Sequence, residues 1–322
     1  MTQAGGGFPG WLEPELASLT SERFSEPSWI YERKFDGERC LTYRTGGQVR
    51  LLTRNQLDVS ATYPELHAAM AAQSSADFVV DGEIVAFDGE ATSFSRLQQR
   101  LGVHSPSPEL VKRVPVCYYL FDVLSAGGRD VRSLPLLERK QVLAGVLAFD
   151  GPLRFAEHRD GDGEPFWEDA CAWGWEGLIA KRADSRYLAG RTRDWLKFKC
   201  VNSQEFVVGG YTDPRGARAG FGALLVGYYD QQGRLVSAGK VGTGFTQAVL
   251  RSLSQELAGI GVPRSPFEAG EVPRSAVHWV QPKLVAQIGF SEWTPAGQLR
   301  HPRYLGLRQD KDPASVVREI PS

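Results

Sequence analysis

The chain has 322 residues, a length that favours two domains, each able to bury its own apolar interior. Hydrophobic residues make up 42% and charged residues 23%, which excludes wholesale disorder, and no apolar run is long enough to span a membrane. The formal net charge of −1 leaves nucleic-acid binding undecided, because such binding depends on where Lys and Arg side chains gather.

The first two hundred residues mix short strands with helices. The run from Trp29 to Arg44 predicts two strands joined by a tight turn at Asp36-Gly37. A helical stretch from Tyr63 to Ala72 precedes a turn-and-strand unit over 77–89. Further strands are expected over 114–124, 176–181 and 195–199, and further helices over 135–147 and 168–175.

Near residue 200 the pattern changes to dense short strands, which we expect over 205–211, 222–230, 235–241, 278–290 and 303–307. Thr246 can cap one helix, which Gly261 and Pro263 would close. A small barrel with one helix is the OB pattern. We therefore expect an α+β protein with a flexible tail over 1–10, a first domain over 11–201 and an OB-fold domain over 202–322.

The four cysteines, Cys40, Cys117, Cys171 and Cys200, are far apart in the sequence and form no C-x-x-C pair. This spacing predicts reduced thiols, with neither a zinc site nor a disulfide framework. The opening residues lack the basic and apolar regions of a secretory signal. We therefore expect a cytoplasmic protein without a membrane anchor.

The first predicted strand carries many charged residues, and Lys34 is the candidate nucleophile among them. An amine is a nucleophile only when it is neutral, and a pocket that desolvates it or surrounds it with cations lowers its pKa. Side-chain alternation places Glu32 and Lys34 on one face of the strand, and the Asp36-Gly37 turn brings Arg39 back beside them. Taken alone, this motif also fits an exposed hairpin whose charges are solvated.

Other predicted strands each place a charge within an apolar run, where an unpaired charge is costly. These charges are Glu83, Glu176, Lys197 and Lys199. Any one of them could be an ion pair within a sheet. A polyanionic ligand with a divalent cation would satisfy them together, with an aromatic side chain such as Phe121 against a base.

These charged segments carry a family resemblance that covers nearly the whole chain. Segments 32–39, 53–55, 81–83, 121–122, 176–181 and 195–199 occur in the order and spacing of the covalent nucleotidyltransferases, and the set resembles ATP-dependent DNA ligases. Segments 290–294 and 299–311 resemble the bacterial end-joining type, ligases C and D. The resemblance implies that the first domain is a nucleotidyltransferase (adenylation) domain of antiparallel sheets with flanking helices.

The resemblance also implies a role for each matching residue, with ATP and Mg²⁺ or Mn²⁺ as cofactors. Lys34 would attack the α-phosphate of ATP and hold AMP. Arg308, Asp310 and Lys311 would orient the pyrophosphate that leaves. The other implied roles are adenine selection by Glu32, ribose or phosphate contacts by Arg39 and Glu83, base stacking by Phe121, metal binding by Glu176 with Glu83, phosphate binding by Lys181, Arg191, Lys197 and Lys199, and a DNA backbone contact by Arg54.

The implied substrate is duplex DNA with nicks or ends. Few residues precede Lys34, so we expect modest, salt-sensitive DNA affinity and a recruiting partner. For the end-joining type, the resemblance suggests a Ku-like end-binding protein and separate primase, polymerase or nuclease modules. We expect a monomer that works at the bacterial nucleoid.

Three alternatives share parts of this pattern. An RNA ligase shares the lysine nucleophile and adenylation, and a GTP-dependent mRNA capping guanylyltransferase shares the lysine and the barrel. A non-catalytic nucleic-acid-binding protein would keep the barrel with an inactive nucleotide pocket. The closing run around Arg308 favours the DNA ligase, and the lack of a cysteine cluster disfavours an NAD-dependent ligase with its zinc finger.

Overall fold

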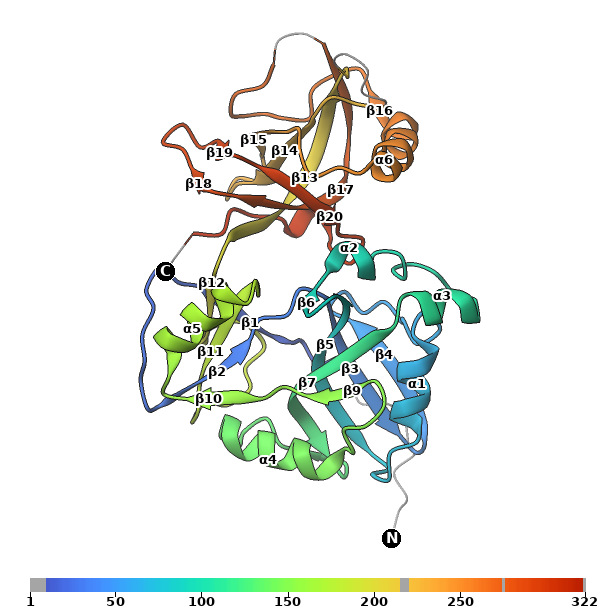
Figure 1. Cartoon of the computed structure of the whole chain (residues 1–322), viewed down its shortest axis with the longest axis vertical. Coiled ribbons are helices and arrows are strands. Elements are labelled where there is room, and N and C mark those ends of the chain that lie inside the picture. Colours follow the sequence, from blue (N-terminus) through green and yellow to red (C-terminus); the bar gives the residue numbers. More distant parts are fainter. Residues whose placement is uncertain (1–9, 215–219, 274–275, 321–322) are drawn as a thin grey trace. The chain divides into compact units, whose positions relative to one another are not determined.

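The computed structural model describes residues 10–214, 220–273 and 276–320 and divides into two compact units (Figure 1). The first unit ends at Cys200 and the second spans Val201–Ile320. Apart from Gly10, the tail expected over residues 1–10 lies outside the described residues. Each unit has its own buried apolar core.

The first unit contains a five-stranded sheet in the order β1-β12-β11-β2-β10. Strand β1 pairs with β12 in parallel, whereas the other neighbours are antiparallel. The strands are β1 (Glu15–Leu19), β2 (Trp29–Arg33), β10 (His158–Asp160), β11 (Gly177–Arg182) and β12 (Gly190–Lys199).

A second, seven-stranded sheet of this unit runs β4-β3-β5-β7-β8, with β6 beside β5 and β9 beside β7. Only β7 and β9 pair in parallel. The predicted α+β class is confirmed, although the sheets are mixed and not purely antiparallel. The strands are β3 (Glu38–Thr45), β4 (Gln48–Thr53), β5 (Phe78–Asp88), β6 (Ala91–Thr92), β7 (Val116–Ala126), β8 (Arg129–Asp130) and β9 (Leu153–Phe155).

Helices cover the sheets of the first unit. Leu66 and Met70 of α1 and Leu143 of α4 pack into the core of the seven-stranded sheet. The helix expected over 168–175 begins earlier and ends at Ala172, two residues before Gly174 adopts a left-handed φ of 73°. The helices are α1 (Pro64–Ala71), α2 (Phe94–Leu97), α3 (Pro108–Arg113), α4 (Leu136–Val146) and α5 (Gly163–Ala172).

The hairpin predicted at Asp36-Gly37 is wrong. Strand β2 belongs to the five-stranded sheet and β3 to the seven-stranded sheet, so residues 34–37 cross from one sheet to the other. A turn signal indicates a change of direction but does not identify the partner strand. Gly37 is required by close approach, because a Cβ there would lie 2.2 Å from the Ile84 carbonyl oxygen.

The unit expected over 77–89 is a single strand, β5, and Asp81-Gly82 lies within it rather than in a turn. A Cβ on Gly82 would lie 2.4 Å from the Tyr119 carbonyl oxygen on the neighbouring strand β7. The glycine therefore permits close strand pairing here.

The second unit has the predicted strand-rich barrel pattern with one helix. Its six-stranded sheet runs β15-β14-β13-β17-β16, with β20 also paired to β17. Thr246 caps α6, as predicted, by accepting a hydrogen bond from the Val249 N–H. The elements are β13 (Asn202–Thr212), β14 (Leu224–Tyr229), β15 (Leu235–Val241), α6 (Gln247–Gly259), β16 (Gly261–Val262), β17 (Val277–Phe290), β18 (Glu292–Trp293), β19 (Leu299–Arg300), β20 (Arg303–Leu307) and the 3₁₀ turn η1 (Pro313–Ser315).

The prediction of four reduced cysteines is wrong for one pair. Cys171 in α5 and Cys200 after β12 form a disulfide, with Cα atoms 5.3 Å apart. Their separation of 29 residues hid a proximity that arises only when α5 packs against the sheet that contains β12. Cys40 and Cys117 are free thiols.

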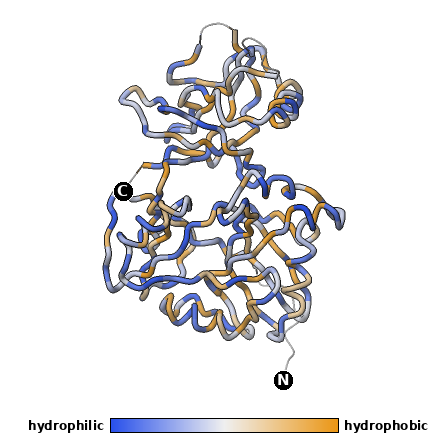
Figure 2. Tube along the Cα trace, viewed as in Figure 1, coloured by the Kyte–Doolittle hydropathy of each residue, from blue (hydrophilic) through white to orange (hydrophobic). Residues whose placement is uncertain are grey.

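Hydrophobic and hydrophilic residues interleave along the elements of both units (Figure 2). Within the described ranges, no helix combines the length and the apolar character needed to cross a membrane.

Candidate active site

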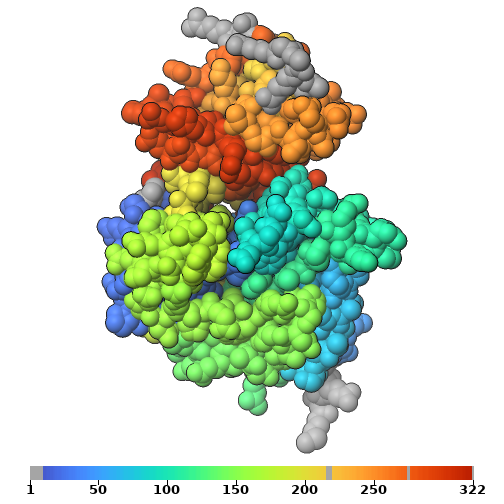
Figure 3. All heavy atoms as spheres, in the orientation of Figure 1, coloured from blue at the N-terminus to red at the C-terminus, as the bar shows by residue number. Residues whose placement is uncertain are grey.

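Lys34 lies where the chain passes between the two sheets of the first unit. Its backbone N–H donates to the Gly177 carbonyl oxygen at 2.9 Å, which ties the crossing segment to β11. Its Nζ forms an ion pair with the Glu176 carboxylate, and both side chains are largely buried, at 18% and 16% exposed. On the face drawn in Figure 3, the first unit is hollowed between the segment around residues 90–105 and that around 160–180.

The charges around Lys34 differ from those expected. Burial lowers the pKa of Lys34, but the carboxylates of Glu176, Asp36 and Glu83 outweigh this effect, so the pKa is raised above its ordinary value. The expectation that surrounding cations lower this pKa is therefore wrong, because the charged groups that act on Lys34 are carboxylates. The amine is held as an ammonium by its acidic neighbours.

Glu32 does not pair with Lys34 on a shared face. It is buried, and its two carboxylate oxygens accept from Lys140 Nζ at 2.5 Å and Lys181 Nζ at 2.6 Å. Burial raises the pKa of Glu32, but the two ammonium groups lower it below its ordinary range. Lys140 was missed by the sequence analysis, although its spacing from Leu136 and Leu143 places it on the buried face of α4.

Arg39 is fixed by Asp81. Its Nε and Nη2 each donate to one Asp81 carboxylate oxygen at 2.6 Å, and Nη2 also reaches the Glu15 carbonyl oxygen at 3.2 Å. Glu83 is the residue paired with Arg39 across β3 and β5. Burial lowers the pKa of Arg39, but Asp81 raises it well above its ordinary value, so this charge is permanent.

Phe121 contacts two cations. The Arg39 guanidinium carbon is 4.5 Å and Lys181 Nζ is 4.3 Å from the centre of its ring, and the ring is 7% exposed. The structure thus brings Phe121, predicted to stack on the base, together with two residues predicted to contact the ribose and the phosphates. Such cation–π contacts orient an aromatic ring as well as attract the cation.

The predicted phosphate-binding residues of β12 lie at opposite ends of the strand. Lys199 pairs with Gly177 of β11, next to Glu176, and Lys197 pairs with Ile179. Arg191 lies at the opposite end of the strand, exposed, where its Nη1 donates to the Ala17 carbonyl oxygen at 2.6 Å. The strand therefore places the two lysines, but not the arginine, beside the Lys34 region.

The remaining predicted residues are Arg54 in the first unit and a motif in the second unit. Arg54 is half-buried and directly follows β4, the edge strand of the seven-stranded sheet. In the second unit, Arg308 donates two hydrogen bonds to Asp310, at 2.8 and 2.7 Å. Lys311 Nζ pairs with Glu205 at 3.0 Å. Burial raises the pKa of Asp310, but Arg308 and Lys311 lower it below its ordinary range.

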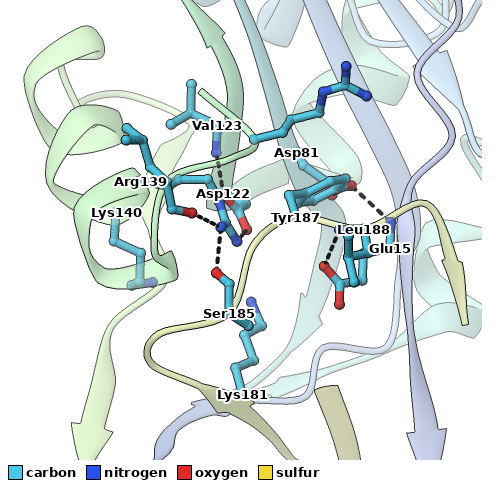
Figure 4. Close-up of polar contacts among 12 residues, drawn as sticks. Glu15, Asp81, Asp122, Val123, Arg139, Lys140, Lys181, Ser185, Tyr187 and Leu188 are labelled. Carbon is cyan, nitrogen blue, oxygen red and sulfur yellow. Dashed lines mark hydrogen bonds and ion pairs between the residues drawn. The ribbon is translucent and has the colours of Figure 1, made fainter. Parts of the chain in front are cut away.

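A buried polar cluster that includes Asp81, the partner of Arg39, was not predicted (Figure 4). Asp122 and Arg139 form a fully buried, bidentate ion pair at 2.7 and 2.8 Å, and Arg139 also donates to the Ser185 carbonyl oxygen at 2.8 Å. The Tyr187 hydroxyl donates to Asp81 at 2.6 Å. Phe121-Asp122 was noted as a motif, but its partners on α4 and on the segment before β12 follow no sequence pattern.

The arrangement can bind an anionic ligand and present an amine to it. Cations from β11 and β12 lie near carboxylates from β5 and the start of β11, around one lysine. A divalent cation fits Glu176, because Mg²⁺ is commonly held by one or two carboxylates together with substrate phosphates. Within the described ranges, no group of three or more His, Cys, Asp or Glu side chains could hold a metal without such a ligand.

Comparison with known families matches both units. A family model for the ATP dependent DNA ligase domain matches residues 14–199, and one for the ATP dependent DNA ligase C terminal region matches residues 217–311.

Among curated relatives, the multifunctional non-homologous end joining protein LigD of Pseudomonas aeruginosa is 38% identical over 322 residues, which cover 98% of this chain and 37% of that protein. LigD of Mycobacterium bovis is 39% identical, over 96% of this chain and 40% of that protein. The chain thus spans well under half the length of these relatives.

A solved structure described as mycobacterial DNA ligase D complexed with ATP and MES is similar in fold, with a TM-score of 0.68 and 35% identity. The match covers 96% of this chain and 98% of that one. The likeness supports the predicted order of an adenylation domain followed by an OB-fold domain.

Proposed function

This chain belongs to the ATP-dependent DNA ligase family, and we propose that it seals breaks between a 5′-phosphate and a 3′-hydroxyl in DNA during end joining, through a covalent lysyl-AMP. The observation that most supports this is Lys34, a largely buried amine at the junction of two sheets, ion-paired with Glu176. A solvated surface lysine would not be buried together with its carboxylate partner.

The reaction is three phosphoryl transfers. The neutral Lys34 amine attacks the α-phosphorus of ATP, an N–P bond forms, and the bond to pyrophosphate breaks. A 5′-phosphate oxygen of DNA then displaces the lysine and takes AMP. Finally the 3′-hydroxyl attacks that phosphate, and AMP leaves. Catalysis in such transfers is mostly alignment of the groups and neutralisation of charge.

The predicted residue roles are kept in this proposal. Lys181, Lys197 and Lys199 would neutralise phosphate charge, Phe121 would stack on adenine, and Glu32 would face its edge. Arg39 and Glu83 would contact the ribose side. Glu176 would hold Mg²⁺ or Mn²⁺, which supplies charge neutralisation on the phosphates. Arg191 and Arg54 would bind phosphates of the nucleotide or of DNA.

The biological setting belongs to the proposal as well. We place this activity on nicked or broken duplex DNA, at the bacterial nucleoid in the cytoplasm, with a Ku-like end binder and separate polymerase or nuclease modules as partners. The relatives named above are multifunctional end-joining proteins, which motivates this setting.

Covalent labelling tests the proposal directly. The protein is incubated with labelled ATP or GTP and Mg²⁺ or Mn²⁺, and we expect an acid-labile AMP adduct that is absent in Lys34→Ala. Lys112→Ala, at an exposed helix position, is the matched control and should label normally. The adduct should be discharged by nicked DNA. A lasting GMP adduct, discharge by nicked RNA alone, or full labelling of Lys34→Ala would contradict the proposal.

A further inference from the structure

A chain of buried hydrogen bonds connects Arg39 to the N-terminal strand of the first unit. The Tyr187 hydroxyl accepts from the Glu15 N–H at 3.0 Å and donates to Asp81 at 2.6 Å. Asp81 in turn binds Arg39 through two hydrogen bonds. In Figure 4, Tyr187 lies between Asp81 and the Glu15–Leu188 pair. The hydroxyl thus uses both its donor and an acceptor position.

The contact between Tyr187 and Asp81 is protected from water. Asp81 is 0% exposed and Tyr187 is 5% exposed. Burial and the charge of Asp81 hold the pKa of Tyr187 well above its ordinary value, so the hydroxyl stays protonated and remains a donor. Because Asp81 accepts from both Tyr187 and Arg39 through Oδ2, the tyrosine limits the rotation of the carboxylate that holds the arginine.

This restraint determines where the guanidinium points. Nε and Nη2 of Arg39 are used by Asp81 and the Glu15 carbonyl oxygen, and the described residues provide no partner for Nη1. The guanidinium also lies 4.5 Å from the centre of the Phe121 ring. Nη1 is therefore the nitrogen left to meet a ligand beside that ring.

We propose that Tyr187 is a positioning residue for nucleotide binding: through Asp81 it fixes Arg39 so that Nη1 meets the ribose or phosphate of ATP. This rests on the proposed function, because it assigns ATP to the site. The proposed role of Tyr187 is to position Arg39, not to contact the substrate. Its ring also packs edge-on against Trp195, at 6.0 Å between centres, and a phenylalanine keeps this contact.

The test measures single-turnover labelling of Lys34 as a function of ATP concentration. Tyr187→Phe should lower the second-order rate of labelling about tenfold, chiefly through a weaker apparent affinity for ATP, which is the loss expected for one buried hydrogen bond to a charged group. Asp81→Asn, which keeps the shape of the side chain but weakens its hydrogen bonds with Arg39, should show the same pattern. It also serves as the second variant if Tyr187→Phe does not fold.

A double-mutant cycle separates positioning from general stability. In the Arg39→Ala background, Tyr187→Phe should cost less than twofold, since there is no guanidinium left to orient. Tyr43→Phe is the matched control, because its hydroxyl accepts from the Leu12 N–H at 2.9 Å and, among the described residues, forms no hydrogen bond with Asp81 or Arg39. It should stay within twofold of the wild type.

The two proposals fail in different ways. If the wild type takes no label from ATP, both the proposed function and this inference are wrong. If the wild type is labelled, the inference alone is wrong in either of two cases. In the first, Tyr187→Phe is labelled at a rate within twofold of the wild type. In the second, Tyr187→Phe lowers the labelling rate tenfold in the Arg39→Ala background as well. If Tyr187→Phe lowers both the labelling rate at saturating ATP and the thermal stability of the protein, the role of Tyr187 is structural only.

Discussion

Lys34 illustrates how one carboxylate can influence both a nucleophile and a metal. Burial lowers the pKa of Lys34, but the carboxylates of Glu176, Asp36 and Glu83 raise it by more, so the amine is charged. Attack on phosphorus requires the neutral amine. Engagement of Glu176 by a cation would remove the strongest of these acidic partners and thereby favour the neutral form. Under the proposed role of Glu176 as a metal ligand, cation binding would therefore favour activation of the nucleophile.

The buried Glu15 carboxylate predicts that the stability of the first unit depends on pH. Its carboxylate is fully buried and accepts from Thr192 and the Leu188 N–H, and burial raises its pKa from 4.5 to about 7. A carboxyl group with a raised pKa favours folding below its unfolded pKa, and this contribution is lost as the pH rises towards the folded pKa. We expect a loss of roughly 3 kcal/mol in the free energy of unfolding over this window.

Urea denaturation of wild type and Glu15→Gln from pH 4 to pH 8 isolates this effect. The variant should become more stable relative to the wild type as the pH rises between 4.5 and about 7. Glu22→Gln, at an exposed position, should show a constant difference from the wild type. A constant difference for Glu15→Gln as well would refute the assignment.

At the scale of elements, the sequence predicted where strands lie better than how they pair. Apolar runs identified β7, β15 and β20 because a strand buried on a sheet must carry apolar side chains. The Asp36-Gly37 turn was misread as a hairpin because strand partners are chosen by tertiary packing. This error also misplaced Lys34, which lies between two sheets rather than on the face of one.

The candidate site was predictable where charge interrupts a strand, as at Glu83 and Lys199. It was not predictable where partners come from helices or irregular segments. Tyr187 lies between β11 and β12, and nothing in its neighbourhood marks it as a partner of Asp81 on β5. A single sequence carries no record of such long-range contacts.

The disulfide between α5 and the end of β12 predicts a redox-dependent stability. It closes a loop that contains β11 and β12, with a separation of 29 residues, and constrains the unfolded chain accordingly. We expect reduction, or the Cys171→Ser/Cys200→Ser double variant, to lower the free energy of unfolding by about 3 to 4 kcal/mol. Urea denaturation with and without dithiothreitol measures this change.

The double variant is also the control, since its stability should not respond to the reductant. Alkylation of denatured, unreduced protein should modify Cys40 and Cys117 alone. Modification of all four cysteines in protein prepared without reductant would show that the bond is absent.

At the scale of the whole molecule, the candidate residues are divided between two compact units. Lys34 and the residues proposed to bind ATP belong to the first unit, and Arg308, Asp310 and Lys311 belong to the second. Each set is ordered by ion pairs within its own unit. We propose that both sets act on one nucleotide, and that the second set is needed only in the step that releases pyrophosphate, because a positioned cation acts on the step whose charge it neutralises.

Asp310→Ala tests that division of labour. Asp310 is 7% exposed and holds the Arg308 guanidinium by two hydrogen bonds, so its loss releases an arginine that we propose orients the leaving pyrophosphate. Pyrophosphate leaves only in the first step. We therefore expect self-adenylation to fall at least tenfold, while the sealing of DNA that already carries AMP stays within about threefold, because a positioned cation chiefly lowers the barrier of the step whose charge it neutralises.

Asp230→Ala, which breaks the Asp230–Arg234 pair of the same unit, is the matched control and should leave both steps near wild type. Equal losses in the two steps for Asp310→Ala would mean that the second unit serves the whole reaction rather than the transfer of AMP to Lys34.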